Sequence, residues 1–328
     1  MSSTELLTGN CLDVLKTLAP RSVQTCVTSP PYYHLRDYES AEQLGTEASP
    51  AEYIANLVTV FRLVREALKD DGTLWINIGD SYADRPIAGT AIKAKDLIGI
   101  PWMLGFALRD DGWWLRQDIV WQKANPYPES ITDRCTKAHE YIFLLSKQRT
   151  YRYDRMAIAE PAIYAEQHAR KATSWGKKKL HVSKNNIEKY QLLGTDNNKT
   201  CLPGGKRNKR SVWTVKVQPY KGAHMATYPE DLIKPCILAA TLPGDTVLDP
   251  FSGAGTTGVV AKSLDRNYVG IELNPHYIVL AMDRIRRTPG FFDDELLLPD
   301  AATDILDDWE YDQLRADLAV LLQDCDNG

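Results

Sequence analysis

The chain has 328 residues, of which 44% are hydrophobic and 25% are charged, and its formal net charge is −4. This composition is ordinary for a globular protein with one large domain or two. No apolar run approaches the roughly 18 residues of a membrane span, and the N-terminal residues lack the basic and apolar segments of a secretory signal. We therefore expect a cytoplasmic protein.

Strand and helix signals alternate along the chain. A capping box, Ser49-Pro50-Ala51-Glu52, begins one helix, and Pro101 and Asn274-Pro275 begin two others. Between residues 155 and 222 the periodic pattern fades. The other predicted elements are strands at 25–28, 73–79 (after an Asp71-Gly72 turn), 113–121, 140–146, 246–249 and 267–272, and helices at 229–241 and 256–264. This alternation predicts an α/β fold around a mainly parallel sheet.

Charge is distributed unevenly. Residues 165–215 hold 12 Lys and Arg but 3 Asp and Glu, whereas residues 293–328 hold 12 Asp and Glu and one Arg. The six cysteines are scattered, with no C-x-x-C pair, which favours reduced thiols over a disulfide framework or a zinc site. The small net charge therefore hides a basic segment and an acidic tail.

The first motif is V-T-S-P-P-Y-Y at residues 27–33. Two consecutive prolines fix two φ angles and remove two backbone donors, so the turn is rigid. An ordinary loop would use Gly, Asn or Asp instead. A rigid turn that holds a hydroxyl, carbonyl groups and two aromatic rings predicts a platform for a flat ligand.

The second motif is D-P-F-S-G-A-G-T-T-G at residues 249–258, which follows an apolar strand and opens a helix. Gly253, Gly255 and Gly258 form G-x-G-x-x-G, and Glu272 ends the next strand, a pattern typical of a nucleoside site. A dinucleotide would lay its pyrophosphate on the helix N-terminus, where an aspartate would repel it. Asp249 instead favours S-adenosylmethionine, whose ammonium it could hold; the alternative is that Asp249 only caps a turn.

Together these residues resemble the amino-methyltransferases of DNA, over roughly residues 5–290. T-S-P-P-Y is similar to the catalytic motif of that family, D-P-F-S-G-A-G-T-T to its cofactor motif and V-G-I-E to its ribose-binding strand. Y-P-E-D-L-I-K-P (228–235) resembles the helix that completes its cofactor site. The order of the motifs resembles the β-class, which implies a Rossmann-like methyltransferase fold with a circularly permuted, mainly parallel sheet and an inserted DNA-recognition segment.

The resemblance divides the chain into four parts. Residues 1–154 are expected to form the catalytic half of the methyltransferase domain, 155–222 the target-recognition insert, 223–290 the cofactor-binding half and 291–328 the acidic tail. Apolar residues in the tail recur at helical spacing, which predicts a helix docked on the body or on a second subunit.

The resemblance also assigns the candidate site residues. Ser29 and the Pro30 carbonyl accept the hydrogens of an exocyclic amino group, Pro31 helps to hold the turn, and Tyr32 stacks on a flipped base, with Tyr33 a second candidate. S-adenosylmethionine is the expected cofactor and no metal is expected. The cofactor-binding residues are Asp249, Phe251, Gly253, Gly255, Thr256, Thr257, Glu272 and Lys234.

The expected substrate is double-stranded DNA, contacted by basic residues through its phosphates. These DNA-binding residues are Lys177, Lys178, Lys179, Lys206, Arg207, Lys209 and Arg210, with Trp175 and Trp213 interleaved. We expect an enzyme associated with the nucleoid. The sequence leaves open whether it forms a homodimer and whether a cognate restriction endonuclease accompanies it.

Ser at the first position of the catalytic motif favours methylation of cytosine N4, with adenine N6 as the alternative. Methylation of a cytosine ring carbon would need a cysteine nucleophile after proline, and Cys236 stands in an apolar helical stretch that favours a buried thiol instead. Two alternatives lie outside the methyltransferases. The glycine motif is also compatible with a nicotinamide oxidoreductase, and the basic segment is also compatible with a non-catalytic DNA-binding module.

Overall fold

The computed structural model describes residues 2–35, 42–161, 206–217, 228–289 and 296–297. It divides into two compact units, one formed by Met1–Tyr153 with Ser211–Gly328 and the other by Asp154–Arg210. The predicted target-recognition insert, 155–222, overlaps the second unit and remains a prediction, and its last part belongs to the first unit. Residues 212–215 form a strand of the first unit, because they pair with a strand of its sheet.

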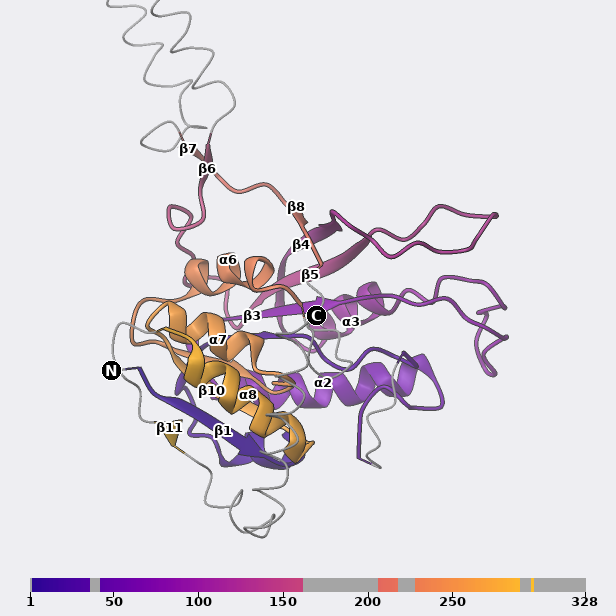
Figure 1. The fold of residues 1–328 in the computed structure, drawn as a ribbon. Coiled ribbons are helices and arrows are strands. Elements are labelled where there is room, and N and C mark those ends of the chain that lie inside the picture. Colours follow the sequence, from indigo (N-terminus) through magenta and orange to yellow (C-terminus); the bar gives the residue numbers. More distant parts are fainter. Residues whose placement is uncertain (1, 36–41, 162–205, 218–227, 290–295, 298–328) are drawn as a thin grey trace, which may run out of the picture. The chain divides into compact units, whose positions relative to one another are not determined.

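The first unit alternates strands and helices, as the sequence predicts (Figure 1). In chain order its elements are β1 (Thr4–Thr8), α1 (Cys11–Val14), a 3-10 turn (Leu15–Thr17), β2 (Val23–Thr28), α2 (Pro50–Ala67), β3 (Leu68–Ile78), α3 (Ile100–Asp110), β4 (Trp114–Lys123), β5 (His139–Ser146), β8 (Val212–Val215), α6 (Glu230–Ala240), β9 (Thr246–Asp249), α7 (Thr256–Ser263), β10 (Asn267–Glu272), α8 (Pro275–Arg287) and β11 (Leu296–Leu297).

Within the described residues these strands form one nine-stranded sheet in the order β11-β1-β10-β9-β2-β3-β5-β4-β8. All neighbouring pairs are parallel except β3 with β5 and β5 with β4. β2, from the N-terminal half, lies beside β9, from the C-terminal half. The order confirms the predicted Rossmann-like fold with a permuted, mainly parallel sheet.

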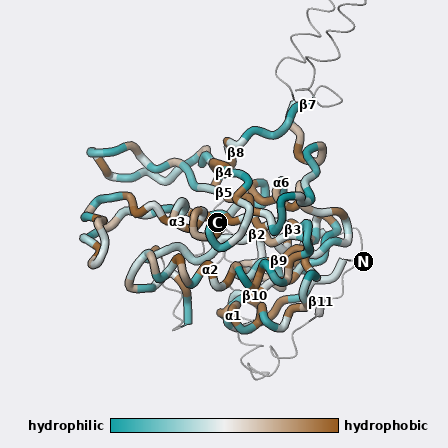
Figure 2. Tube along the Cα trace, turned by 180° about the vertical axis from the view of Figure 1, so that it is seen from behind, coloured by the Kyte–Doolittle hydropathy of each residue, from teal (hydrophilic) through white to brown (hydrophobic). Residues whose placement is uncertain are grey.

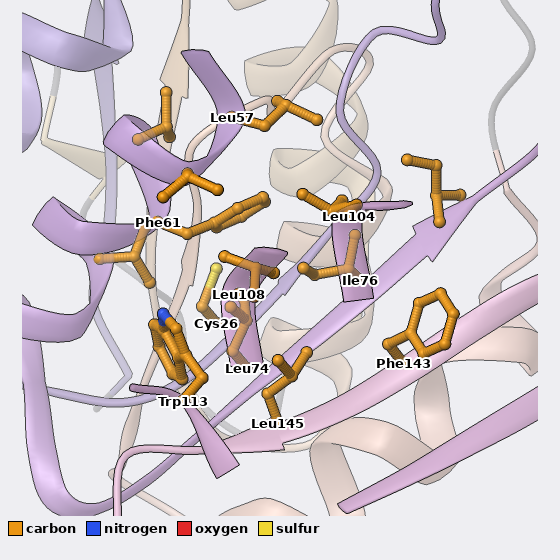
Figure 3. Close-up of a cluster of buried hydrophobic side chains, with 14 of the residues drawn as sticks. Cys26, Leu57, Phe61, Leu74, Ile76, Leu104, Leu108, Trp113, Phe143 and Leu145 are labelled. Carbon is orange, nitrogen blue, oxygen red and sulfur yellow. The ribbon is translucent and has the colours of Figure 1, made fainter. Parts of the chain in front are cut away.

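Helix α2 begins where the sequence predicts. Ser49 is its N-cap and accepts a hydrogen bond from the Glu52 amide at 3.2 Å, which satisfies one of the free donors of the first turn. Its apolar face packs with α3 against β2, β3 and β5, in a cluster that contains Phe61 from α2, Leu104 from α3 and Ile76 from β3 (Figure 3). This core fixes the strands whose ends carry the first motif.

Helices cover both faces of the sheet. α1, α2 and α3 pack with the hydrophobic cluster on one face, whereas α6, α7 and α8 lie on the other (Figure 1). Hydrophobic segments are concentrated where strands and helices pack together (Figure 2). Both faces of a central parallel strand are buried, and the six residues of β2 are all buried although Gln24, Thr25 and Thr28 are polar.

Some predicted boundaries are wrong. β3 begins at Leu68, so Asp71-Gly72 lies inside the strand, at an irregularity in its pairing with β2, and does not form a separate turn. Trp113 precedes β4 and is buried in the core. β1 and β8 are not predicted at all. The predicted tail helix lies outside the described residues. Of residues 291–328, the structure describes only β11, which pairs with β1.

Candidate active site

The carboxyl ends of the central strands lie at one edge of the sheet, because β2, β3, β9 and β10 are parallel. Ser29 follows β2, Asp249 ends β9 and Glu272 ends β10. β5 is antiparallel to β3, so its first residues return to the same edge. The topology therefore brings the two predicted motifs together, although they are far apart in the sequence.

The turn after β2 is anchored from helix α2. The Tyr53 hydroxyl donates a hydrogen bond to the Pro31 carbonyl at 2.6 Å. Tyr33 is 4% exposed, and its ring packs on the ring of Tyr53 with centroids 5.5 Å apart. The burial of Tyr33 leaves Tyr32 as the stacking candidate of this turn.

The hydroxyl of Tyr32 joins the turn to the neighbouring strands. It donates to Glu140 Oε2 at 2.7 Å, lies 3.2 Å from Asn77 Oδ1, and accepts a hydrogen bond from Ser29 Oγ at 3.4 Å. Burial, together with the negative charge of Glu140, raises the pKa of Tyr32 well above its ordinary value. The phenol therefore stays protonated at physiological pH. Ser29 is partly exposed, whereas Pro30 is buried.

Asp249 lies at the centre of a buried hydrogen-bond cluster. Its side chain is 1% exposed and accepts from Thr28 Oγ1 at 2.6 Å, Thr257 Oγ1 at 2.5 Å, the Tyr228 hydroxyl at 3.0 Å and the Phe251 amide at 3.1 Å. Burial raises the pKa of Asp249, against the effect of these donors.

The Tyr228 and Thr257 hydroxyls also form a hydrogen bond with each other. Each hydroxyl has a single hydrogen, so only one of the two can donate to Asp249 at a time, and donors fill at most three of the four acceptor positions of the carboxylate. The bond from the Phe251 amide, two residues later, is the turn cap that the sequence indicates as the alternative role of Asp249. A direct contact between Asp249 and the cofactor remains a prediction, and the geometry favours a role in which Asp249 holds the surrounding segments.

The glycine loop needs its glycines. Gly253 and Gly255 have φ of +51° and +74°, in the left-handed region. A Cβ on Gly255 would lie 2.7 Å from Ala281 Cβ, and a Cβ on Gly258 would lie 2.6 Å from Tyr268 Cε1. Gly255 and Gly258 thus let α7 pack closely on α8 and β10, as a nucleoside-binding loop requires.

The carboxylate of Glu272 is placed so that it could accept hydrogen bonds from a ribose. Its Oε2 accepts from the Gly253 amide at 2.8 Å and its Oε1 accepts from the Asn274 amide at 2.9 Å, so each oxygen keeps a lone pair. The side chain is partly exposed, and burial raises the pKa of Glu272. A carboxylate held beside a glycine loop is the acceptor that two ribose hydroxyls need.

The other predicted cofactor residues are placed differently. Phe251 is partly buried at the edge of the core. Thr256 is 5% exposed and accepts from Arg284 Nη1 at 3.1 Å, and Thr257 is fully buried against Asp249. Lys234 lies on the exposed side of α6. The two threonines act on the fold of the loop, and direct contact of these residues with a cofactor stays a prediction.

The second unit carries part of the predicted DNA-binding set. β6 (Glu160–Pro161) pairs with β7 (Lys206–Arg207), and Glu160 Oε1 accepts from Arg207 Nε at 2.9 Å and from Arg210 Nε at 2.6 Å. Although burial alone would raise it, the two arginines lower the pKa of Glu160. Lys206 is exposed and Lys209 is partly exposed. Lys177, Lys178, Lys179 and Trp175 lie outside the described residues.

Trp213 does not belong to an exposed basic surface. It lies in β8, opposite Trp121 of β4, and is 5% exposed. Its ring is part of the sheet packing, so the prediction that it interleaves with DNA-contacting residues is wrong. The sequence places it next to a basic run, but its burial depends on pairing with a distant strand.

The alternative chemistries find little support. Cys236 is fully buried in α6, as predicted for a packing residue. In the part of the chain that the structure describes, no group of His, Cys, Asp and Glu could hold a metal ion. The same residues include no helix long and apolar enough to cross a membrane.

Comparison with known families decides the class. A family model described as "DNA methylase" (N6_N4_Mtase) matches residues 23–283, which include both motifs. The chain belongs to the N6/N4 DNA methylase family. It is therefore a DNA amino-methyltransferase, and with the family comes the cofactor expected from the sequence, S-adenosylmethionine.

Relatives of this DNA methylase are similar along most of their length. Type II methyltransferase M.Cfr9I of Citrobacter freundii is 44% identical over 305 residues, 87% of this chain and 89% of the relative. Type II methyltransferase M.SmaI of Serratia marcescens is 42% identical over 306 residues, 88% and 92% of the two chains. The alignments therefore span most of this chain and most of each relative.

Solved structures share the fold. PvuII DNA methyltransferase, which is cytosine-N4-specific, superposes with a TM-score of 0.60 over 93% of this chain and 92% of its own, at 19% identity. A putative DNA modification methylase of Thermus thermophilus in complex with S-adenosyl-L-methionine gives 0.57 over 90% of this chain and 100% of its own, at 24% identity. These likenesses concern the fold of the DNA methylase.

Sequence reasoning missed several residues of the DNA methylase site. Tyr53, Asn77, Gly79 and Glu140 all contact the turn after β2, and Tyr228 contacts Asp249. Each of these residues lies in a predicted strand or helix or directly beside one, but only the order of the strands in the sheet shows which of them contact one another. Two signals were available: the acidic Glu140 in the mostly apolar strand β5, and Tyr228 at the start of the stretch that resembles the cofactor-site helix of the family.

Proposed function

We propose that this DNA methylase transfers a methyl group from S-adenosylmethionine to N4 of a cytosine in double-stranded DNA, within a specific recognition sequence. The alternative product is N6-methyladenine. Ser29 carries the proposal, because the N4 enzymes that this chain resembles tend to have Ser where N6 enzymes tend to have Asp or Asn. The cytosine-N4-specific structural neighbour adds only the fold, since its identity is 19%.

The turn after β2 suits the chemistry of an exocyclic amine. The lone pair of such a nitrogen is delocalised into the ring, and hydrogen bonds from its two hydrogens draw it towards tetrahedral geometry. Ser29 Oγ donates to the Tyr32 hydroxyl, so its lone pairs remain free to accept one amino hydrogen. The Pro30 carbonyl accepts the other, and the prolines hold both acceptors in place beforehand.

S-adenosylmethionine supplies a methyl group on a positively charged sulfur. Glu272 and the glycine loop would hold its ribose, and they lie at the same edge of the sheet as Ser29 because β2 and β9 are adjacent parallel strands. The target base must leave the duplex to reach this edge, and Tyr32 stacks on it there. The amino nitrogen would itself be the nucleophile: its bond to the methyl carbon forms as the carbon–sulfur bond breaks, S-adenosylhomocysteine leaves, and the nitrogen loses one proton to solvent. The protein therefore needs no covalent intermediate.

Recognition of DNA is assigned to the segment between β5 and β8. The unit Asp154–Arg210 contains the basic residues that would contact phosphates, and Asn, Gln and Arg there would read base edges. The acidic tail is unsuited to contact with the duplex because of its charge. As relatives named type II methyltransferases are 44% and 42% identical, we propose that a restriction endonuclease recognises the same sequence.

The decisive experiment is expression in a host without DNA methylation. Genomic DNA is digested to nucleosides and the methylated one identified by mass spectrometry, while modification-sensitive sequencing gives the recognition sequence. N4-methylcytosine supports the proposal. N6-methyladenine alone would contradict the substrate while leaving the roles of Ser29, Pro30 and Tyr32 intact.

A Ser29→Ala variant tests the mechanism in the same assay. It should lose most turnover for either base, because the acceptor for the amino hydrogen is removed, and keep its affinity for S-adenosylmethionine, because the proposed cofactor residues are unchanged. Full activity of Ser29→Ala would refute the mechanism. Two further assays are independent of this one. Protection of the DNA from an endonuclease of the same specificity tests the proposed restriction partner, and light scattering measures the oligomeric state.

A further inference from the structure

The ring of Tyr32 is confined on one side by β3. An ideal Cβ on Gly79, the residue after β3, would lie 2.6 Å from Tyr32 Cε2 and 3.1 Å from Cδ2. Only a glycine leaves room for the ring in this place. The contact with Gly79 fixes the plane of the Tyr32 ring. The hydrogen bond of the hydroxyl alone cannot fix this plane, because the hydroxyl oxygen lies on the Cβ–Cγ axis about which the ring rotates.

The hydroxyl fixes the direction of the side chain. It donates to Glu140 Oε2 at 2.7 Å, a distance typical of a bond to a carboxylate. Ring contact and hydroxyl bond are independent constraints, one on the plane and the other on the far end. Together they hold the Tyr32 side chain in one orientation before any base arrives.

Glu140 is itself held on both oxygens. Lys123 Nζ lies 2.5 Å from Oε1, and Asn77 Nδ2 donates to Oε2 at 3.2 Å and to the Tyr141 carbonyl at the same distance. The Glu140 side chain is 13% exposed. These residues come from three adjacent strands, β3, β4 and β5, so the sheet register sets where the carboxylate lies.

We propose that Glu140 is a positioning residue for methyl transfer, which fixes Tyr32 through its hydroxyl so that the stacked target base presents its amino group to Ser29. The inference rests on the proposed role of Tyr32 as the stacking ring. Transfer to a sulfonium methyl requires reacting atoms in line and about 3–3.5 Å apart, so a tilted base reacts slowly even when it binds. Glu140 therefore acts on the rate of the bound complex.

The test compares Glu140→Leu, which removes the acceptor at similar size, with Glu140→Gln, which keeps one. Tyr32→Phe removes the hydroxyl and keeps the ring. Glu140→Leu and Tyr32→Phe should each lower kcat about tenfold or more, with calorimetric affinity for S-adenosylmethionine unchanged. Glu140→Gln should stay within about fivefold of the native enzyme, because its amide oxygen still accepts from the phenol.

Two further readouts separate positioning from folding. A fluorescent analogue of the target base, placed in duplex DNA, should be quenched less by Glu140→Leu than by the native enzyme, because stacking is less regular. The double variant Tyr32→Phe with Glu140→Leu should lose no more kcat than Glu140→Leu alone, because both changes remove the same hydrogen bond, the one between Tyr32 and Glu140. Asp245→Asn, which removes a carboxylate 3.1 Å from Lys69 at the opposite edge of the sheet, should keep full kcat.

The outcomes distinguish this inference from the proposed function. Native kcat in Tyr32→Phe overturns the positioning role, and this variant keeps the ring even where Glu140→Leu fails to fold. Independent, multiplicative losses in the double variant overturn it as well. Full activity of Tyr32→Ala would instead remove Tyr32 as the stacking ring, and the proposed function of the turn would fail with it.

Discussion

Thr28 and Asp249 are joined by a buried hydrogen bond of 2.6 Å, although they are 221 residues apart in the chain. Thr28 ends β2, directly before the Ser-Pro-Pro-Tyr turn, and Asp249 ends β9, directly before the glycine loop. The bond therefore ties the start of the turn proposed to bind the target base to the start of the loop proposed to bind the cofactor.

Thr28→Val tests this coupling, because it keeps the shape of the side chain and removes the donor. We expect a loss of about 1–3 kcal/mol in the free energy of unfolding, since a buried carboxylate loses a partner, and weaker binding of S-adenosylmethionine. Denaturant unfolding and calorimetry measure the two effects. Thr25→Val is the matched control on the same strand: its hydroxyl bonds to Thr73, so it should alter stability but not cofactor affinity. Equal affinity in both variants would show that the bond is not coupled to the cofactor site.

Gly255→Ala should destabilise the protein more than Gly244→Ala. Both glycines have a positive φ, +74° and +82°, so both variants strain the backbone. A Cβ at 255 also meets Ala281 Cβ at 2.7 Å, whereas nothing lies within 4 Å of a Cβ at 244. We expect the difference in the free energy of unfolding to be about 1–3 kcal/mol, the cost of overpacking. Equal losses in the free energy of unfolding of the two variants would mean that α7 and α8 move apart easily enough to accommodate the added Cβ.

Glu272→Ala should weaken the binding of S-adenosylmethionine by about 1–3 kcal/mol, because two ribose hydroxyls lose a charged acceptor. The variant also leaves the amides of Gly253 and Asn274 without their partner, so stability falls as well. Isothermal titration calorimetry on the folded variant measures the affinity directly. Unchanged affinity would exclude Glu272 from the cofactor site.

Burial raises the pKa of Glu272, which predicts opposite pH dependences for stability and for cofactor binding. The folded apoprotein holds this proton more tightly than the unfolded chain does. The stability that Glu272 contributes is therefore fully present below the unfolded pKa of about 4.3 and is lost as pH rises through the raised pKa. Binding needs the ionised carboxylate, so affinity should fall as pH falls through the same raised pKa. A cofactor-induced increase in Tm that does not change across this window would contradict the prediction.

Neutralising Lys206, Arg207, Lys209 and Arg210 together should weaken DNA binding and flatten its salt dependence. Each lost phosphate contact reduces the log–log slope by about 0.9. The ion pairs of Arg207 and Arg210 with Glu160 complicate the full variant, because it also removes contacts that join β6 to β7.

A variant restricted to Lys206 and Lys209 keeps the ion pairs of Arg207 and Arg210 with Glu160. Its slope should fall by about 1.8 if both lysines contact phosphates, measured by fluorescence anisotropy over a range of salt concentrations. Glu160→Gln is the complementary variant: it leaves all four basic residues and should bind DNA more tightly. An unchanged slope in the lysine variant would mean that this segment does not follow the DNA backbone.

The sequence by itself determined the class of chemistry and the order of the elements. The Pro-Pro turn and the glycine loop are local devices, in which φ restriction and the absence of a Cβ act within a few residues, so both can be read without a fold. The capping box at Ser49 is local in the same sense. The family and the permuted fold follow from these motifs and their order.

Tertiary structure alone decided which side chains act together. Glu140 and Tyr32 meet because β5 returns antiparallel to β3, and Tyr228, Thr28 and Thr257 converge on Asp249 from separate elements. The burial of Trp213 in β8 has the same origin, since it depends on pairing with β4. Strand pairing and burial join residues at long sequence separation, and no local pattern records the partner that each residue will find.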